Sequence, residues 1–452
     1  MELRLLLRHR EAMLAQVRDD MPAAEAACRA LVEDFPAASY YVRGSLFTGL
    51  LHASREQFKL GEMDRFDALA RDCIQQSSND SARAVHESIA GSTLFMAGRC
   101  DAAISALRAG LAVAVRLGGA GHAVGALTAL PLAEILYEQN SLEEAAALIA
   151  VYLPVAHELG FVDQLVSGYL TAARLCRRRG DVEAALTLLD RGLSAARQRG
   201  FPRLEAWVSA ERVKLLTTEC SRARALGQAR REAGARVDPL QLMGGANVTT
   251  LHEARALAWV RVARAQCRIS DALRVARSWR ALASRSGATR SLIRWEIQLA
   301  ALLVLDGQKR AAIRALGRAA TAAAPGRFFA SFVDEGPVVE TLLAEQPDGF
   351  AAFGATTRAF VSRLLPMFDG SRARLPLHSA DDSLPVTTAA LSPKDIEVLA
   401  LAAKGWRNQD IAARLGMSEA TVKWYLHQCY EKLGVSKRAY AADKARRFGL
   451  ID

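Results

Sequence analysis

The sequence predicts an all-α protein in two parts, a long array of helical hairpins followed by a small four-helix module. Ala, Leu and Arg dominate a composition with few aromatic residues, and this mix favours packed helices over sheets. Turn signals recur about every 40 residues along most of the chain. A stretch rich in Gly, Pro, Ser and Asp at residues 370–390 then precedes a last segment with clear helix caps. With 452 residues, the chain is too long for one ordinary core.

The turn signals are short dipeptides, each of which ends one helix and precedes an Ala-rich helix. They are Gly61-Glu62, Gly98-Arg99, Asn140-Ser141, Gly180-Asp181, Cys220-Ser221, Cys267-Arg268 and Gly307-Gln308. Successive signals lie 37, 42, 40, 40, 47 and 40 residues apart. Such regularity indicates a repeated structural unit. The break near residues 239–245 is expected to be a long loop between helices of the array.

The clearest copy of the unit spans residues 162–200. Apolar residues such as Leu165 and Tyr169 recur at helical spacing up to residue 179, where Gly180 supplies a left-handed stop. Leu188, Leu189 and neighbouring residues then form the apolar face of a second helix. Each unit is therefore predicted to be an αα-hairpin. Because one hairpin cannot bury both faces of its helices, neighbouring hairpins must stack into a right-handed superhelix with a concave surface.

The hairpins share a motif that points to a known family. The pattern Gly-Leu-x-x-Ala-x-x-Leu-Gly at residues 110–118 returns as Gly-Leu-x-x-Ala-x-x-x-Gly at residues 192–200. Residues 38–369 resemble the tetratricopeptide-like region of the MalT group of regulators, although a period near 40 also overlaps that of HEAT and armadillo arrays. The stretch Phe-Phe-Ala-Ser-Phe-Val-Asp-Glu-Gly at 328–336 is similar to a segment near the end of such arrays. We expect residues 1–369 to be the repeat domain and residues 370–390 to be a flexible linker.

Residues 391–452 form the second predicted domain, and their capping residues define four helices. The predicted N-caps are Ser392, Asn408, Ser418 and Ser436, and the predicted helix stops are Gly405, Gly416 and Gly434. The second and third helices are joined by the short turn at residues 416–418, which is the spacing of a helix-turn-helix.

The third helix of this module, residues 419–433, has two distinct faces. An apolar stripe formed by Val422, Leu426, Cys429 and Leu433 is expected to be buried. The opposite face carries Lys423, Trp424 and His427. An exposed Trp on a polar face is unusual, and a Lys and a His can both reach purine acceptors in the major groove.

The whole module resembles the LuxR-type DNA-binding domain. The resemblance rests on Leu-Ser-Pro at 391–393, Thr-Val-Lys-Trp at 421–424 and Lys-Leu-Gly-Val at 432–435. It implies a sequence-specific regulator of transcription that contacts DNA bases through Lys423, Trp424 and His427. The resemblance also implies that five residues contact backbone phosphates: Arg407, Asn408, Thr421, Lys437 and Arg438.

The charge pattern agrees with a DNA partner but is modest. The chain carries +11, of which residues 391–452 carry +4, with eleven cations against seven anions. A single small module with this charge would bind weakly, so we expect a homodimer that reads two half-sites of double-stranded DNA and contacts RNA polymerase. No apolar stretch approaches the roughly 18 residues needed to span a bilayer, and seven scattered cysteines indicate a reducing compartment. We therefore predict a cytoplasmic protein without a membrane partner.

No motif in the sequence indicates an enzyme. It contains no G-x-x-x-x-G-K-[ST] loop, no G-x-S-x-G nucleophile elbow and no Gly-rich dinucleotide fingerprint. The His-Glu pairs at residues 86, 157 and 252 lack a second His four residues after the first, so they are expected on the surface of helices. We predict no catalytic residue, no cofactor and no metal.

Three hypotheses for the function remain open. The first is a transcription factor whose repeats sense a small molecule or a protein. Four tryptophans of the repeats could line an inducer site, although core packing is the simpler explanation: Trp207, Trp259, Trp279 and Trp295. The second hypothesis is a protein-interaction scaffold or an antagonist of a larger regulator, with secondary DNA binding. The third is a nucleotide-switched regulator whose ATPase lies on another chain.

Overall fold

The computed structural model describes residues 2–119, 121–218, 227, 248–344, 350, 352–372, 393–433, 438, 441, 442 and 445. All regular elements among these residues are helices, which confirms the predicted all-α class. The chain divides into two compact units, residues 1–376 and 377–452. No helix of the described part is both long enough and apolar enough to cross a membrane.

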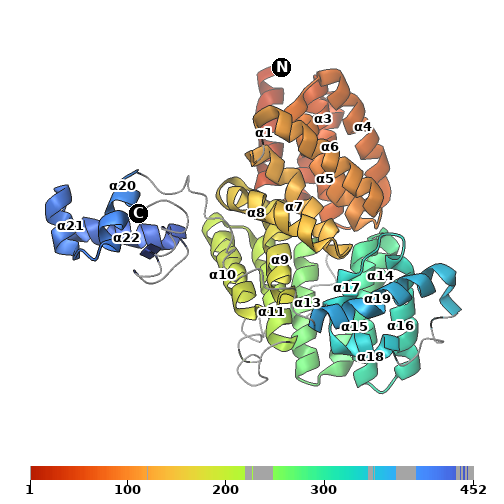
Figure 1. The fold of residues 1–452 in the computed structure, drawn as a ribbon. Coiled ribbons are helices and arrows are strands. Elements are labelled where there is room, and N and C mark those ends of the chain that lie inside the picture. The colour runs from red at the N-terminus through yellow and green to blue at the C-terminus, as the bar shows by residue number, and fades with distance from the viewer. Residues whose placement is uncertain are drawn as a thin grey trace. The chain divides into compact units, whose positions relative to one another are not determined.

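The first unit is built of antiparallel helical pairs (Figure 1). Its helices are α1 (Glu2–Val17), α2 (Met21–Asp34), α3 (Tyr40–Glu56), η1 (Leu60–Glu62), α4 (Met63–Ser77), α5 (Asp80–Met96), α6 (Cys100–Gly118), α7 (Ala123–Glu138), α8 (Leu142–Leu159), α9 (Val162–Arg178), α10 (Val182–Arg199), α11 (Pro202–Thr218), α13 (Thr250–Ala265), α14 (Ile269–Ser286), α15 (Thr289–Leu305), α16 (Lys309–Ala323), α17 (Ala330–Val333), α18 (Pro337–Ala344) and α19 (Ala355–Arg372).

The predicted turns between paired helices are left-handed residues. Gly98, Asn140, Gly180, Cys267 and Gly307 all have positive φ angles, between 60° and 82°. A left-handed residue ends a helix because it turns the chain and lets the last carbonyls accept hydrogen bonds from the following amides. The repeat period therefore reflects one structural device used again at each hairpin.

One predicted turn has its left-handed residue at another position, and one lies outside the described residues. At the third helix the left-handed residue is Phe58, with a φ of 58°, whereas Gly61 lies in the short η1 helix. The Cys220-Ser221 signal and the predicted loop at residues 239–245 lie outside the described residues. An additional turn of the same type occurs at Asp19, with a φ of 63°, between α1 and α2.

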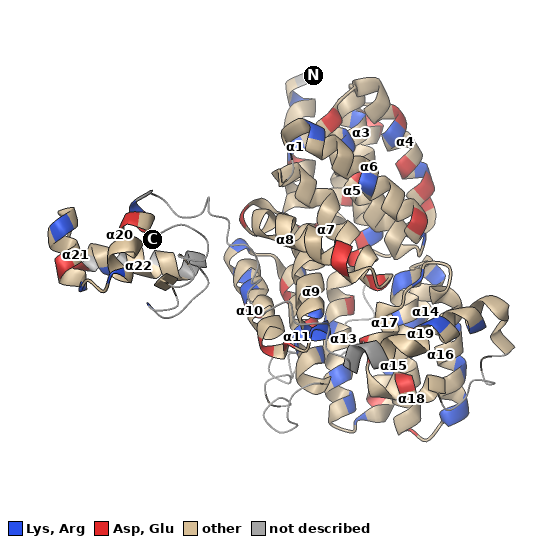
Figure 2. Ribbon diagram, in the orientation of Figure 1, with Lys and Arg blue, Asp and Glu red and all other residues tan. Residues whose placement is uncertain are grey.

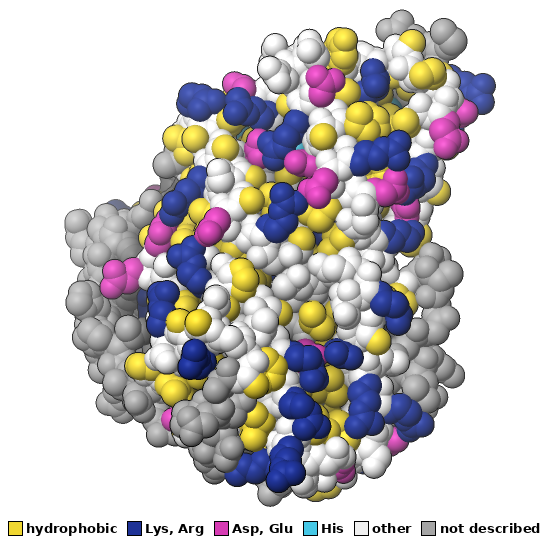
Figure 3. All heavy atoms as spheres, turned by 90° about the vertical axis from the view of Figure 1, so that its right-hand side faces the viewer, with side chains coloured by type: hydrophobic (Ala, Val, Ile, Leu, Met, Phe, Trp, Pro, Cys, Tyr) yellow, Lys and Arg dark blue, Asp and Glu magenta, His cyan; other side chains and the backbone are white. Residues whose placement is uncertain are grey.

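The pairs stack so that one helix of each faces the inside of the superhelix. Helices α3, α5, α7, α9, α11 and α13 pack against one another in succession, and α15 returns to contact α5. Outer helices such as α4 carry acidic and basic residues (Figure 2), and Asp64, Arg65 and Asp72 of α4 are exposed. Lys and Arg outnumber Asp and Glu over the lower part of the face shown in Figure 3. The basic residues of the chain are thus not confined to its second unit.

The segment at 328–336 closes the array against its own first half. The backbone amide of Phe329 donates to the Glu138 carbonyl at 2.9 Å, and α17 packs against α7. Phe328, Phe329 and Phe332 are fully buried. Helix α19 then continues through residues 370–372, where the sequence predicted the start of a linker, and residues 373–390 lie outside the described part of the chain.

The tryptophans of the repeats and several residues of the His-Glu pairs are buried. All four tryptophans of the repeats are buried, and Trp279 stacks on Trp295 with ring centroids 5.8 Å apart. The prediction of surface positions for the His-Glu pairs is wrong for His86, Glu87 and Glu253, which are buried. Their burial is possible because each has a partner. Arg71 binds Glu87 at 2.7 Å, and the indole of Trp295 donates to Glu253 at 3.0 Å.

Candidate nucleic-acid interface

Three helices of the second unit form a compact arrangement with its own core. They are α20 (Pro393–Ala403), α21 (Asn408–Leu415) and α22 (Glu419–Leu433). Val398 of α20, Ile411 of α21 and Val422 of α22 are each fully buried in one cluster. Leu399 and Cys429 begin a second cluster on the other side of α20. The relative orientation of the three helices is therefore fixed by apolar packing.

A tight turn sets the angle between α21 and α22. Gly416 has a φ of 64°, a left-handed conformation that ends α21, and the amide of Met417 donates to the Ala412 carbonyl at 3.0 Å. The Ser418 hydroxyl accepts from the amide of Thr421 at 3.1 Å, which caps the start of α22. The predicted stop at Gly416 and the predicted cap at Ser418 are both confirmed.

Helix α22 has one buried and one exposed face, as the sequence predicted. Val422, Leu426 and Cys429 are at most 4 % exposed. Lys423 and His427 are exposed and lie one helical turn apart on the opposite side. The helix can therefore be covered by the rest of the unit while its polar side chains face a ligand.

Lys423 already has a neighbour on the exposed face. Its ammonium lies 2.9 Å from a carboxylate oxygen of Glu419, one turn earlier, and the side chain remains 62 % exposed. An exposed pair of this kind contributes about 0–1 kcal/mol. Breaking the pair with Glu419 therefore costs little free energy when the Lys423 ammonium moves to a base or a phosphate.

Arg438 is used inside the unit. Its guanidinium donates to the Ala402 carbonyl at 2.9 Å, to the Asn408 side-chain oxygen at 3.2 Å and to the Trp406 carbonyl. These contacts supply donors to backbone carbonyls at the end of α20, and they link that end to the start of α21. The side chain is half-buried, and its contact with a DNA phosphate stays a prediction.

The other predicted contact residues are distributed around this frame. Arg407 is exposed and precedes the first residue of α21, so Asn408 begins that helix and is not its cap. Thr421 lies in the first turn of α22, with its hydroxyl 2.7 Å from that of Ser418. Trp424 lies within α22, but its side chain is outside the described residues, as are Ser392, Gly434, Ser436 and Lys437.

One exposed aromatic side chain was not singled out from the sequence. Trp406 is 37 % exposed between α20 and α21, and the guanidinium of Arg414 lies 5.6 Å from its ring centroid. The signal that could have identified it is its position directly after the helix stop at Gly405. Tyr430 packs against both apolar clusters of the unit, and burial raises the pKa of its phenol.

Comparison with known families assigns both units. The MalT-like TPR region matches residues 10–347, which is more than half of the chain. The luxR family of bacterial regulatory proteins matches residues 389–445, which include α20, α21 and α22.

Each of the following similar proteins aligns with at most 25 % of this chain. The probable transcriptional regulatory protein SgaR of Hyphomicrobium methylovorum is 36 % identical over 104 residues, which cover 23 % of this chain and 49 % of SgaR. The serine/threonine-protein kinase PknK of Mycobacterium tuberculosis is 36 % identical over 114 residues, 25 % of this chain and 10 % of PknK. The HTH-type transcriptional activator RamA of Corynebacterium glutamicum is 39 % identical over 64 residues, 14 % of this chain and 23 % of RamA. The chain thus spans about half of SgaR and a tenth of PknK.

Proposed function

The chain belongs to the family with a MalT-like TPR region and carries a luxR-family DNA-binding domain at residues 389–445, and we propose that it regulates transcription by binding specific double-stranded DNA sequences. The observation that carries the proposal is the division of α22 into two faces. Its buried stripe is held by α20 and α21, so Lys423 and His427 are presented on a helix of fixed orientation. We assign no catalytic activity to the chain.

In this proposal α22 enters the major groove as the recognition helix. Lys423 and His427 would donate hydrogen bonds to purine N7 or O6 atoms, and Trp424, one residue after Lys423, would contact a thymine methyl or a sugar. The tight turn at Gly416 holds α21 across the end of α22, which is how the first helix of a helix-turn-helix crosses the DNA backbone.

Backbone phosphates would be held by residues beside this helix. Arg407 precedes α21 with an exposed guanidinium, and Thr421 lies in the first turn of α22, where amides and the helix dipole favour an anion. Lys437 would extend this set. The Asn408 amide group could donate to a phosphate while its oxygen accepts from Arg438, so Arg438 would act on DNA binding through the position of Asn408.

The repeats would supply regulation. We propose that they sense a small molecule or a protein and thereby control homodimer formation or contact with RNA polymerase, in the cytoplasm. Support for a dimer comes from the charge of +4 over residues 391–452, because few phosphate contacts give a single module low affinity at physiological salt.

Selection of bound sequences from random duplex DNA, followed by footprinting with the full chain, tests the proposal. We expect a protected site with two half-sites one helical turn or a multiple of it apart. A fragment of residues 377–452 should protect a half-site at higher protein concentration, because that unit has its own core. Equal binding to all sequences would contradict specific recognition and would favour the scaffold or antagonist instead. Copurified nucleotide would favour a separate ATPase partner.

A further inference from the structure

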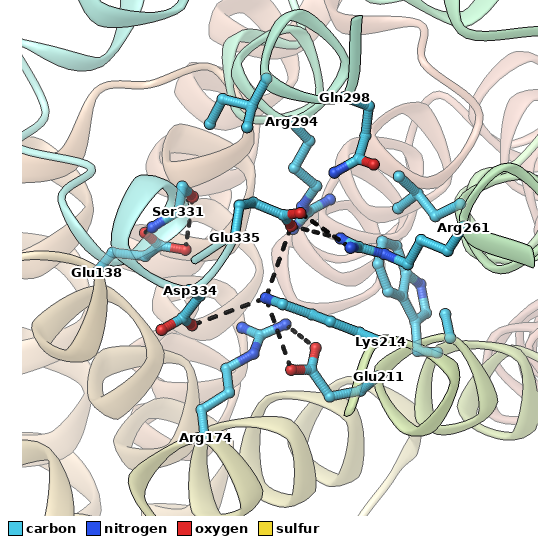
Figure 4. A pocket seen from close by; sticks show the side chains of 14 residues that line it. Glu138, Arg174, Glu211, Lys214, Arg261, Arg294, Gln298, Ser331, Asp334 and Glu335 are labelled. Atoms are coloured by element: carbon cyan, nitrogen blue, oxygen red, sulfur yellow. Dashed lines mark hydrogen bonds and ion pairs between the residues drawn. The ribbon is translucent and has the colours of Figure 1, made fainter. Parts of the chain in front are cut away.

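A small cavity lined mainly by charged and polar side chains lies inside the superhelix (Figure 4). Its walls come from α9, α11, α13 and α15, with the turn after α17 on the other side. Arg294 and Trp207 also line a second cavity, so these two side chains form the wall that the two cavities share.

Arg294 is a buried cation of this wall whose nearest counter-charge is one carboxylate at 3.5 Å. Its guanidinium lies 4.9 Å from the ring centroid of Trp207 and 3.5 Å from a carboxylate oxygen of Glu253. It makes no hydrogen bond to any described residue. Burial, together with the like charge of Arg290, lowers the pKa of Arg294 to about 10. The surroundings therefore disfavour its positive charge, and an anion beside it would relieve that cost.

Lys214 approaches the cavity from α11 and lies near three carboxylates without a hydrogen bond to any of them. Its ammonium lies 3.7 Å from Glu335 and 3.9 Å from both Glu211 and Asp334. These distances exceed those of hydrogen bonds, so its donors are unsatisfied among the described residues. Figure 4 shows Lys214 and Arg294 directed toward the middle of the cavity from different helices.

Two buried acceptors face the same space. Gln298 Oε1 and Glu211 Oε1 have no hydrogen-bond partner among the described residues. Gln298 lies one turn after Arg294 on α15, so the two side chains share one face of that helix. Buried polar atoms are rarely left without a partner, which marks these two as candidate ligand contacts.

The other charged groups of the cavity are paired with one another. Arg174 donates to Glu211 Oε2 at 2.6 Å, and both carboxylate oxygens of Glu335 accept from Arg261. Glu138 accepts from the amide and hydroxyl of Ser331, at 2.9 and 3.0 Å. The lining groups that make no hydrogen bond to a described residue therefore include the Arg294 guanidinium, the Lys214 ammonium, Arg174 Nε, Gln298 Oε1 and Glu211 Oε1.

We propose that this cavity binds a small organic anion, a carboxylate or phosphate monoester that also carries a hydroxyl or amino group. Its acid group accepts hydrogen bonds from Arg294 and Lys214. A hydroxyl of the ligand donates to Gln298 Oε1 or to Glu211 Oε1, and an amino group donates to both. A neutral polyol would leave the charge of Arg294 uncompensated, and an apolar ligand would leave all four polar groups unsatisfied. Only the effect of the ligand on DNA binding rests on the proposed sensor role of the repeats.

Isothermal titration calorimetry of the full chain tests the site with four probes. Malate carries two carboxylates and one hydroxyl, and glycerol 3-phosphate carries one phosphate and two hydroxyls. Succinate is the dicarboxylate without the hydroxyl, and erythritol has hydroxyls but no charge. We expect saturable binding of malate or glycerol 3-phosphate at constant ionic strength, at least tenfold tighter than succinate or erythritol. Malate alone would identify a carboxylate ligand, and glycerol 3-phosphate alone a phosphate ester.

Variants locate the binding. Arg294→Gln should weaken the preferred anion at least tenfold, whereas Arg280→Gln, which alters an outer pair with Glu296, should leave it unchanged. If Arg294→Gln does not fold, Gln298→Leu removes the amide with a similar volume and should abolish the preference for malate over succinate. The site is rejected if no anion binds beyond the effect of salt, if erythritol binds equally well, or if these variants bind as the parent does. Anion binding that leaves DNA affinity unchanged would contradict the sensor role while the site stands.

Discussion

The Tyr137 hydroxyl donates to both carboxylate oxygens of Asp334, at 3.0 Å each, although 197 residues separate the two side chains in the sequence. Arg177 donates to the same carboxylate at 2.5 Å. Asp334 follows α17, whereas Tyr137 and Arg177 belong to α7 and α9. The contact therefore joins the end of the array to its middle, so the superhelix is held by long-range polar contacts as well as by neighbouring hairpins.

Tyr137→Phe should destabilise the repeat unit by about 1–2 kcal/mol, because it removes the hydrogen bonds of one fully buried donor to a charged acceptor. Asp334→Asn should cost about 3–5 kcal/mol, since Arg177 and Lys214 would lose a buried counter-charge. Urea unfolding followed by circular dichroism measures both changes. The exposed Tyr40 provides the control, and a Tyr40→Phe variant as unstable as Tyr137→Phe would contradict the assignment.

The pH dependence of stability should depend on Glu211. Burial acts to raise the pKa of Glu211, but Arg174 and Lys214 lower it to about 2, below the ordinary 4.5. A carboxyl whose pKa is depressed on folding stabilises the fold above its unfolded pKa and loses that contribution as pH falls. Glu211→Gln should therefore be less stable than the parent at pH 7, by up to about 3 kcal/mol.

That difference should shrink as the pH is lowered from about 4.5 toward 2, since the parent then takes up the proton that the Gln variant cannot bind. Unfolding at a series of pH values measures it. Glu205→Gln is the matched control, because Glu205 is 43 % exposed and pairs with Arg197 on the surface. A difference for Glu211→Gln that does not change with pH would show that Glu211 titrates normally.

The spacing of the hairpins depends on glycines at close contacts. A Cβ atom on Gly110 would lie 2.7 Å from Thr128 Cγ2 and 2.8 Å from Glu87 Cβ, because α6 packs closely on its neighbours there. Gly110→Ala should thus cost about 1–3 kcal/mol through overpacking. A Cβ atom on Gly61 would have no neighbouring atom within 4 Å, so Gly61→Ala should be nearly neutral. Thermal unfolding measures both changes, and equal losses for the two variants would refute the packing argument.

The repeat and its turns could be predicted from local sequence because each turn uses a residue suited to a left-handed conformation. Gly98, Gly180 and Gly307 are such residues, and their spacing alone indicates the hairpins. Phe58 could not be found in this way, since a left-handed Phe is unusual and is held there by the packing around it. The two-faced pattern of α22 could likewise be predicted, because one helix contains the whole signal.

Side chains whose role depends on distant partners could not be predicted. Arg438 has the sequence position of a phosphate contact, yet it binds the carbonyl of Ala402, 36 residues earlier. The buried charges of the cavity look like ordinary surface residues in the sequence, because their partners come from other hairpins. Arg174 and Glu211, for example, lie 37 residues apart. The packing of α9 on α11 brings these two side chains together.

Arg438 and Arg407 should differ in how their loss affects DNA binding. Arg438→Ala removes the contacts that hold α20 to α21, so it should lower the thermal stability of the 377–452 fragment by about 1–3 kcal/mol. Arg407→Ala should leave that stability unchanged and should weaken binding to all DNA sequences, with a reduction of the salt slope by about one. Calorimetric unfolding and salt titrations of DNA binding separate the two. The positioning role fails if Arg438→Ala unfolds like the parent.

Base recognition should be lost selectively when the exposed face of α22 is altered. Lys423→Ala or His427→Ala should each lower affinity for the selected site by about 1–3 kcal/mol and relax the preference for particular bases, because each removes a donor to a base edge. Both side chains are exposed opposite the buried Val422 and Leu426, so the fold should be unaffected. Glu419→Gln releases Lys423 from its 2.9 Å pair and should raise affinity slightly without changing the preferred bases.

Competition binding with the selected site and with random duplexes measures these effects for each variant. Loss of specific and random binding to the same extent in Lys423→Ala would mean that Lys423 contacts phosphate, so that α22 would be rotated about its axis relative to the orientation proposed. Unchanged binding in both alanine variants would exclude α22 as the recognition helix. In that case DNA binding would be secondary in this protein, and the array of hairpins would act as a scaffold for protein partners.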